Sequence, residues 1–441
     1  MTAIDEGLLG PVGAGRDDLV ADRRFLDALV EAEVALAAAY ADIGVASPTL
    51  SRAVADALAD ASAGFDVAEI AAAAVAGGNP VIPMVARLKA AVPADARFWV
   101  HRGATSQDIW DTAIMIVARR ALQQVRSSLE DAAQSLRDLA AAHRDDLAVA
   151  RTLTQHAVPT TIGLRAAVWQ RSLRRAAQHL EALELPAQLG GAGGTLASFV
   201  EITGSPDAAA RLVAAFADRA GLAVPAAAWH VTRWPITELG DALVQSVDAA
   251  GKLATDVATL SRTEIGELAE GTGGGSSAMP QKQNPAEAVL IRSAALRAPQ
   301  LGATLHLAAA LAADERPDGA WHAEWPTLRE LLRLALGASG HASTMVAHLR
   351  VHADAAARNL ALTNGLVVSE RLSLVLAPLI GKERVARLVA DAAAGGDLAA
   401  LVKALPEASD LDVDALLDPA DYTGLAGRLV DDVTHTHQEE A

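Results

Sequence analysis

The stretch ITELGDALVQSVDAAGKLATDVATLSRTEIGELAE, residues 236–270, decides the fold. It contains no proline, and its large apolar residues recur every three or four positions, which is the spacing of one face of an α-helix. These residues are Leu239, Leu243, Val247, Leu253, Val257 and Leu260. At 1.5 Å per residue, the stretch predicts a helical rod of roughly 50 Å.

Similar helical patterns fill most of the chain, and breaks rich in Pro and Gly separate them. The clearest patterns span residues 110–145, 164–185, 286–313 and 326–350. No segment alternates apolar and polar residues clearly enough to predict a sheet. We therefore expect an all-α protein with an N-terminal helical domain (1–105), an elongated central bundle (106–350) that carries a glycine-rich loop (271–285), and a C-terminal helical domain (351–441).

The composition limits what the chain can do. Of its 441 residues, 51% are hydrophobic and none is cysteine, and its formal net charge is −17. Without cysteine, a disulfide, a thiolate metal site or a cysteine nucleophile is impossible. The negative charge argues against nucleic acid as a partner, because binding phosphates requires a basic surface. A small anionic ligand remains possible at a locally positive site.

The N-terminal residues MTAIDEGLLG carry acids where a signal peptide has basic residues. No apolar run reaches the roughly 18 residues that a membrane-spanning helix needs. We therefore expect a cytoplasmic protein that does not enter a membrane.

One loop, EGTGGGSSAMPQKQNP at residues 270–285, differs in composition from its surroundings. It could be a plain connector, with Gly271 ending one helix, Asn284 capping the next and Pro285 beginning it. Yet lysine is rare in this chain, and Lys282 lies inside the loop. A glycine run lets backbone N–H groups approach an anion and lets a loop close over a ligand. A phosphate-binding P-loop would need Gly-Lys-Ser/Thr after a strand, which is absent.

The loop resembles the GSSxMPxKxNP signature of the fumarase/aspartase superfamily, since GSSAMPQKQNP at 275–285 matches every specified position. Two other stretches are similar to superfamily blocks and stand in the same order. They are HRGATSQD at 101–108, followed by Asp111 and Thr112, and TLTQHA at 152–157. The resemblance covers most of the chain and implies an all-helical, three-domain enzyme. It also implies a homotetramer in which three subunits build each active site.

Further stretches are similar to the cycloisomerase branch of the superfamily, which interconverts 3-carboxy-cis,cis-muconate and a lactone in aromatic degradation. They are GGNPVIPMV (77–85), TLTQHAVPTTIGL (152–164), QLGGAGGTLAS (188–198), WH (229–230) and GAWHAEWPTL (319–328). This branch implies a small polycarboxylate substrate, an intramolecular carboxylate addition and no cofactor. The alternatives are a fumarate-releasing C–N lyase of the adenylosuccinate or argininosuccinate type and a noncatalytic structural homologue.

The resemblance also implies roles for matching residues. Ser276 exchanges the proton at carbon, and Lys282 stabilises the dianion formed when a proton leaves next to a carboxylate. His101 and His156 are the other candidate catalytic residues. The candidate substrate contacts are Thr105, Ser106, Gln107, Gln155, Arg233, Ser277, Met279 and Asn284. Structural explanations compete with some of these roles, because Thr105 or Ser106 could merely cap a helix and Arg233 could be an ordinary surface arginine.

Two positions depart from the superfamily pattern. Other branches usually carry a histidine after the first Thr of the THxQxA block and a glutamate seven residues past the signature lysine, where this chain has Leu153 and Val289. Water or an amine needs an acid in order to leave, whereas a carboxylate does not. The paired absence therefore favours the cycloisomerase branch, although His156 or Glu287 could substitute.

Three glutamates just before the loop, Glu264, Glu267 and Glu270, share a predicted helical face. They could suggest a metal, but a solvated face or salt bridges between subunits explain them better. The tail histidines His435 and His437 are expected to belong to a disordered end. We therefore predict no metal site.

Overall fold

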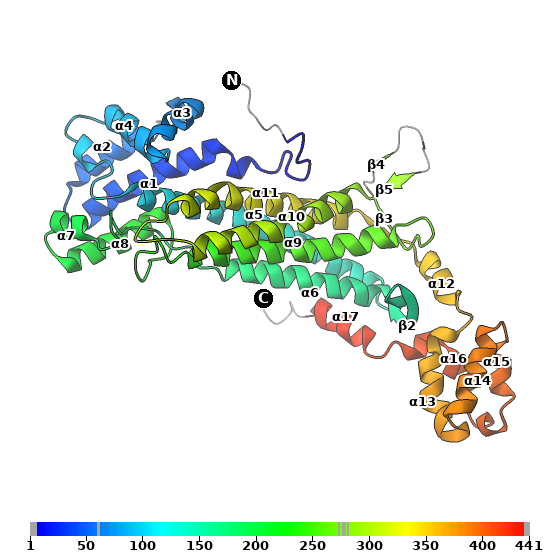
Figure 1. Ribbon diagram of the computed structural model, residues 1–441. Helices are drawn as coiled ribbons and strands as arrows, with labels where there is room; N and C mark the ends of the chain where they lie inside the picture. Colours follow the sequence, from blue (N-terminus) through cyan, green and yellow to red (C-terminus); the bar gives the residue numbers. More distant parts are fainter. Residues whose placement is uncertain (1–6, 60–61, 272–273, 276–278, 280–281, 436–441) are drawn as a thin grey trace. The chain divides into compact units, whose positions relative to one another are not determined.

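The computed structural model describes residues 7–59, 62–271, 274–275, 279 and 282–435. Helices dominate it, which confirms the predicted all-α class (Figure 1). The chain forms two compact units. Unit 1 comprises Met1–Ser127, Ala177–Asp248 and Ser293–Gly340, and unit 2 comprises Ser128–Ala176, Ala249–Arg292 and His341–Ala441.

The sequence predicts several long helices, and the structure contains them. Each of them begins in one unit and ends in the other. They are α5 (Ser106–Ala142), α6 (Ile162–Glu181), α9 (Trp234–Leu260), α10 (Ala286–Ala310) and α11 (Gly319–Ala347). Helix α9 is shorter than its sequence pattern, which extends to residue 270. The backbone N–H of Gly266 bonds to the Arg262 carbonyl in a left-handed conformation (φ 62°), and the Glu267 N–H returns to the Leu260 carbonyl. A glycine in this conformation ends a helix.

Unit 1 also contains helices that lie entirely within it. They are α1 (Asp22–Asp42), α2 (Pro48–Leu58), α3 (Val67–Gly77), α4 (Val81–Ala91), α7 (Ala197–Thr203) and α8 (Pro206–Ala220). Helix α1 packs against α2 and α8 and buries Leu29, Leu36 and Tyr40 (Figure 1). The hydroxyl of Ser205 caps α8 by accepting the Ala208 N–H, which fixes where that helix begins.

Unit 2 contains a C-terminal cluster of short helices. They are α12 (Ala353–Ala361), α13 (Ser369–Ile380), α14 (Lys382–Ala393), α15 (Leu398–Lys403), α16 (Val413–Leu417) and α17 (Ala426–His435). Helices α13 to α16 enclose a core that includes Leu372, Leu376 and Val402. Within the described part of the chain, no single helix is long and apolar enough to cross a membrane. One pair bent by 77°, Ala353–Ala361 with Leu366–Ile380, qualifies by length and composition alone.

Short antiparallel strand pairs, which the sequence pattern did not predict, occur in unit 2. They are β1 (Leu147–Thr152) with β2 (Gln155–Thr161), β3 (Leu268–Glu270) with β6 (Leu349–Val351), and β4 (Gly274–Gly275) with β5 (Gln283–Asn284). The β1–β2 turn consists of Leu153 and Thr154, and both have positive φ, at 47° and 73°. Such a two-residue turn favours Asn-Gly, so this hairpin carries no turn signal that the sequence could reveal.

We expect Thr154→Gly to stabilise unit 2 by about 1 kcal/mol, because a β-branched residue in the left-handed region is strained and glycine is not. Denaturant unfolding would measure the change. Thr160→Gly, in the paired part of β2, is the matched control and should destabilise instead. A loss of stability in Thr154→Gly would contradict the assignment of strain to this turn.

Candidate active site

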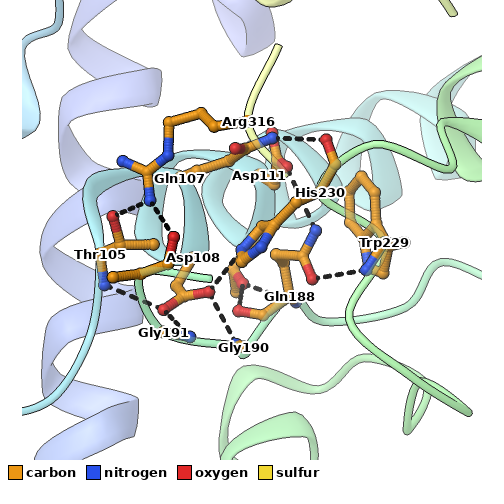
Figure 2. A network of polar contacts seen from close by, with 12 residues as sticks. Thr105, Gln107, Asp108, Asp111, Gln188, Gly190, Gly191, Trp229, His230 and Arg316 are labelled. Atoms are coloured by element: carbon orange, nitrogen blue, oxygen red, sulfur yellow. Dashed lines mark hydrogen bonds and ion pairs between the residues drawn. The ribbon is translucent and has the colours of Figure 1, made fainter. Parts of the chain in front are cut away.

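The turn that precedes α5 is held by one buried carboxylate, Asp108 (Figure 2). Its Oδ2 accepts the backbone N–H groups of Thr105 at 2.9 Å and Gly191 at 3.0 Å. Its Oδ1 accepts the Gly190 N–H at 2.8 Å and contacts His230 Nε2 at 2.8 Å. Asp108 therefore joins the GATSQD turn to the glycine-rich segment after residue 188 and to the WH dipeptide at 229–230.

Three predicted substrate contacts lie at the start of α5. Thr105 is almost buried, and its Oγ1 accepts a hydrogen bond from Arg316 Nη2 at 2.5 Å. Ser106 is half-buried at the first position of the helix. Gln107 is fully enclosed, and its Nε2 donates to the His230 carbonyl at 2.9 Å. A direct contact between Gln107 and a substrate would therefore require that side chain to leave its enclosure.

Arg233 has a different environment from the one predicted for a carboxylate clamp. It is fully buried, and its guanidinium donates to Asp111 at 2.7 Å and 3.1 Å and to Glu324 at 2.6 Å. Burial alone would lower the pKa of Arg233, but Asp111 and Glu324 together raise it above its ordinary value. Its charge is fully used within this triad, so the geometry corrects the expectation that Arg233 grips a substrate.

Two arginines that the sequence analysis did not single out are better placed to bind an anion. Arg316 is exposed, and its bonds to Thr105 Oγ1 and the Ala192 carbonyl leave its charge uncompensated. Arg102 stacks over Phe98, 3.8 Å from the ring centroid. Among the described residues, neither guanidinium has a carboxylate partner. Arg102 lies inside the HRGATSQD block, which could have revealed it, whereas Arg316 lies outside every block that the sequence analysis identified.

His101 occupies the same turn in a left-handed conformation (φ 59°). Its ring Nδ1 lies 2.6 Å from the carboxyl Oε1 of Glu33 on α1. The ring is therefore oriented by the protein, as expected for a histidine with a chemical role.

Unit 2 holds the signature loop. Ser276 and Ser277 lie outside the described residues. The base of the loop is closed by Glu270, whose carboxylate accepts the N–H groups of Glu287 and Ala288 at the start of α10. Asn284 is half-buried, whereas Lys282 and Met279 are exposed. A cavity of about 210 Å³ adjoins the loop and is lined in part by Arg262, Glu270, Gln283, Asn284 and His352.

Gln155 and His156 begin β2, also in unit 2. Gln155 is exposed and His156 is half-buried. Burial lowers the pKa of His156, Arg151 lowers it further, and Glu267 opposes them. The imidazole is therefore mainly neutral at pH 7, the form that can accept a proton.

The glutamates before the loop are not the solvated face that the sequence suggested. Glu267 is buried and pairs with Arg151 at 2.6 Å and with Arg165 at 3.2 Å. Glu270 is buried at the loop base, and only Glu264 is exposed. The part of the chain that the structure describes contains no group of three His, Asp or Glu side chains arranged to hold a metal.

The two departures from the superfamily pattern are both solvent-facing. Leu153 is 96% exposed at the tip of the β1–β2 turn, and Val289 is 53% exposed on the first turn of α10. Glu287 faces the ring of His341, with which it forms a very short contact. Glu287 is therefore already engaged by a histidine of the same unit.

Comparison with known proteins places this arrangement in a family. A family model described as a lyase matches residues 16–299. Nitrosuccinate lyase from Streptomyces davaonensis is 45% identical, over 97% of this chain and 94% of that protein. The 3-carboxy-cis,cis-muconate cycloisomerase from Pseudomonas aeruginosa is 38% identical, over 94% and 93% respectively. The crystal structure of 3-carboxy-cis,cis-muconate lactonizing enzyme from Pseudomonas putida matches with a TM-score of 0.88 at 33% identity, covering 98% and 99% of the chains.

The fold and the signature loop thus define a lyase-type enzyme. The chain belongs to the lyase family of the fumarase/aspartase superfamily, which confirms the resemblance seen in the sequence. Its relatives include both cycloisomerases and a lyase that acts on a nitro compound.

Proposed function

We propose that the protein is a β-eliminating lyase that converts 2-nitrosuccinate into fumarate and nitrite. The observation that carries the proposal ahead of its alternative is the 45% identity to nitrosuccinate lyase. The pair Leu153 and Val289, apolar and exposed at the two positions where the resemblance implies an acid and its partner, supports it. A lyase without that acid suits a leaving group that departs as a stable anion. Nitrite is such a group, and water and amines are not.

The proposed reaction balances without a cofactor. Ser276, as its alkoxide, takes a proton from the CH₂ carbon next to one carboxylate, and the released electron pair forms the double bond of fumarate. The C–N bond breaks, and nitrite leaves with its electrons. The proton then passes from Ser276 to solvent. The negative charge that accumulates on the activated carboxylate is stabilised by Lys282 and Asn284.

The charges of the described residues support a dicarboxylate substrate. Arg316 and Arg102 flank the GATSQD turn, and a guanidinium can grip a carboxylate with two parallel hydrogen bonds. We propose that Arg316 and Thr105 together bind one carboxylate, in the role that the sequence suggested for Arg233. Ser106 and Gln155 remain proposed substrate contacts, as do Ser277 and Met279 in the loop.

The second candidate is the predicted one, closure of 3-carboxy-cis,cis-muconate to a lactone. In its reverse direction the leaving group is a carboxylate, which needs no acid either, so the exposed Leu153 is equally compatible with it. The similarity to cycloisomerases from two Pseudomonas species supports it. The higher identity to nitrosuccinate lyase supports elimination of nitrite as the first candidate.

The decisive experiment is to incubate purified protein with each substrate in turn. With 2-nitrosuccinate we expect fumarate and nitrite to appear in a 1:1 ratio, measured by absorbance and by colorimetric nitrite assay. Loss of the muconate diene with formation of a lactone, and no nitrite from nitrosuccinate, would establish the second candidate. Turnover of neither compound by the folded protein would refute both candidates.

We expect Arg316→Gln to raise KM by about 10–100-fold while changing kcat little, because it removes a charge-assisted bond made to the bound carboxylate. Arg211→Gln, an exposed arginine of the same unit on α8, is the matched control and should leave both constants unchanged. An unchanged KM in Arg316→Gln would remove Arg316 from substrate binding.

We also propose that subunits associate through α10. Large apolar side chains stay exposed along one side of this helix and at its end, namely Val289, Leu296, Leu307 and Leu311. An apolar stripe of this kind marks an interaction surface. The candidate residues are distributed over both units of the chain, which agrees with a tetramer whose active sites are shared between subunits. The mass of the protein in solution tests whether it forms a tetramer.

A further inference from the structure

His101 is held by a single buried carboxyl group, that of Glu33. Glu33 belongs to α1 and is only 1% exposed. Its Oε1 contacts the ring Nδ1 at 2.6 Å, and its Oε2 accepts the backbone N–H of the same residue at 2.9 Å. Among the described residues, His101 is the only partner of this carboxyl group. Glu33 therefore fixes both the backbone and the ring of one residue.

This contact determines which nitrogen of the His101 ring can accept a hydrogen bond or a proton. An ionised carboxylate only accepts hydrogen bonds, so Nδ1 must carry a proton and Nε2 is left as the acceptor in the neutral ring. The His101 side chain is 18% exposed, and within the described part of the chain Nε2 has no partner. The ring thus keeps a basic nitrogen that has no partner among the described residues, on a partly exposed side chain in the segment that leads to Thr105.

This arrangement costs free energy that a purely structural contact would not need to spend. A histidine with φ of 59° stores on the order of 1–3 kcal/mol of backbone strain, which glycine would avoid. Burying a carboxyl group adds a desolvation cost that only its hydrogen bonds offset. Strained, over-determined residues of this kind concentrate at functional sites.

The geometry points to Glu33 as a positioning residue that sets the tautomer of His101 and stabilises its imidazolium when Nε2 takes up the proton that Ser276 has removed from carbon, before that proton passes to solvent. The inference rests on the proposed function, because it makes His101 a catalytic residue of that site. In this step the O–H bond of Ser276 breaks, Nε2 gains that proton while Nδ1 keeps its own, and Nε2 then releases the proton to solvent. Glu33 would act as the carboxylate of a catalytic triad does, by orienting an imidazole and stabilising its protonated form.

Kinetics on Glu33→Gln test this role. An amide cannot compensate the imidazolium charge, so we expect kcat to fall by about 10–100-fold with KM little changed. His101→Asn should lower kcat at least as far, and the double variant should match His101→Asn alone, because Glu33 acts through the ring. A further loss in the double variant, or an effect on KM only, would overturn the proposal.

Tyr40→Phe is the matched control. Tyr40 is a buried residue of the same helix, and its hydroxyl donates to the Arg102 carbonyl at 2.9 Å. Its removal perturbs the same turn without touching the His101 ring. We expect its kcat to stay within about twofold of the wild type. A fall in kcat as large as that of Glu33→Gln would show that any disturbance of the turn suffices, and would contradict a specific role for Glu33.

A readout that needs no substrate separates this inference from the proposed function. Solid-state NMR of protein labelled with [¹⁵N]histidine, compared with His101→Asn, reports which nitrogen of His101 carries the proton. We expect a protonated Nδ1 in the wild type. A neutral ring protonated at Nε2 would refute the inference even if nitrite is released. A protonated Nδ1 would uphold the tautomer assignment even if neither candidate substrate reacts.

Discussion

Ser276→Ala should lower kcat by about 10²–10⁴-fold, the range typical for loss of a group that transfers a proton in the transition state. In the proposed mechanism Ser276 removes the proton at carbon, and alanine has no oxygen to do so. KM should change little, because the hydroxyl acts on the reacting carbon and not on the anchoring carboxylate. Steady-state kinetics on 2-nitrosuccinate and on 3-carboxy-cis,cis-muconate measure the effect on whichever compound reacts.

The neighbouring serine provides the control for this experiment. Ser277 is proposed to bind substrate, so Ser277→Ala should mainly raise KM, by the roughly 10-fold that a single hydrogen bond supports. Both variants should keep the unfolding midpoint and the solution mass of the wild type. If Ser276→Ala retains most of its activity while Ser277→Ala loses it, the proton transfer belongs to Ser277 and the assignment from the signature is wrong.

The sequence predicted the long helices because their signal is local. Apolar residues at helical spacing identify α5, α6, α9, α10 and α11 to within a few residues at most ends. The sequence pattern placed the end of α9 too far along the chain, because the helical spacing continues through Glu267 and Glu270. These two side chains turn inward toward partners distant in sequence. The β1–β2 hairpin was missed for a related reason, since its turn uses Leu153 and Thr154 in place of glycine.

The candidate site was predicted only where a motif marks it. The blocks around His101 and Lys282 could be found because each is a contiguous pattern, and the resemblance carried their roles. Contacts between distant segments left no such pattern. The pairing of Glu33 with His101 and that of Arg316 with Thr105 span 68 and 211 positions respectively. Periodicity cannot reveal such pairs, and residue type alone made Arg233 look like the clamp.

Arg233→Met should lower the free energy of unfolding by about 3–5 kcal/mol, the cost of leaving buried charges without their partner. Asp111 and Glu324 would then face each other in a dry interior, and Trp321 Nε1, which donates to Asp111 at 3.0 Å, could compensate only in part. Burial already raises the pKa of Glu324 above its ordinary value, although Arg233 opposes that rise. Without the guanidinium, protonation of Glu324 would relieve part of the penalty, so the variant should recover some stability as the pH falls.

Denaturant unfolding of Arg233→Met decides between the two roles considered for this arginine. The matched control is Arg87→Met, which removes the exposed pair with Glu69 in the same unit and should cost about 0–1 kcal/mol. A buried triad predicts a large loss of stability that pH modulates. A substrate clamp predicts nearly wild-type stability with a strongly raised KM. The second outcome would return Arg233 to the substrate and would mean that the triad opens when substrate binds, because both carboxylates must release the guanidinium before it can grip a ligand.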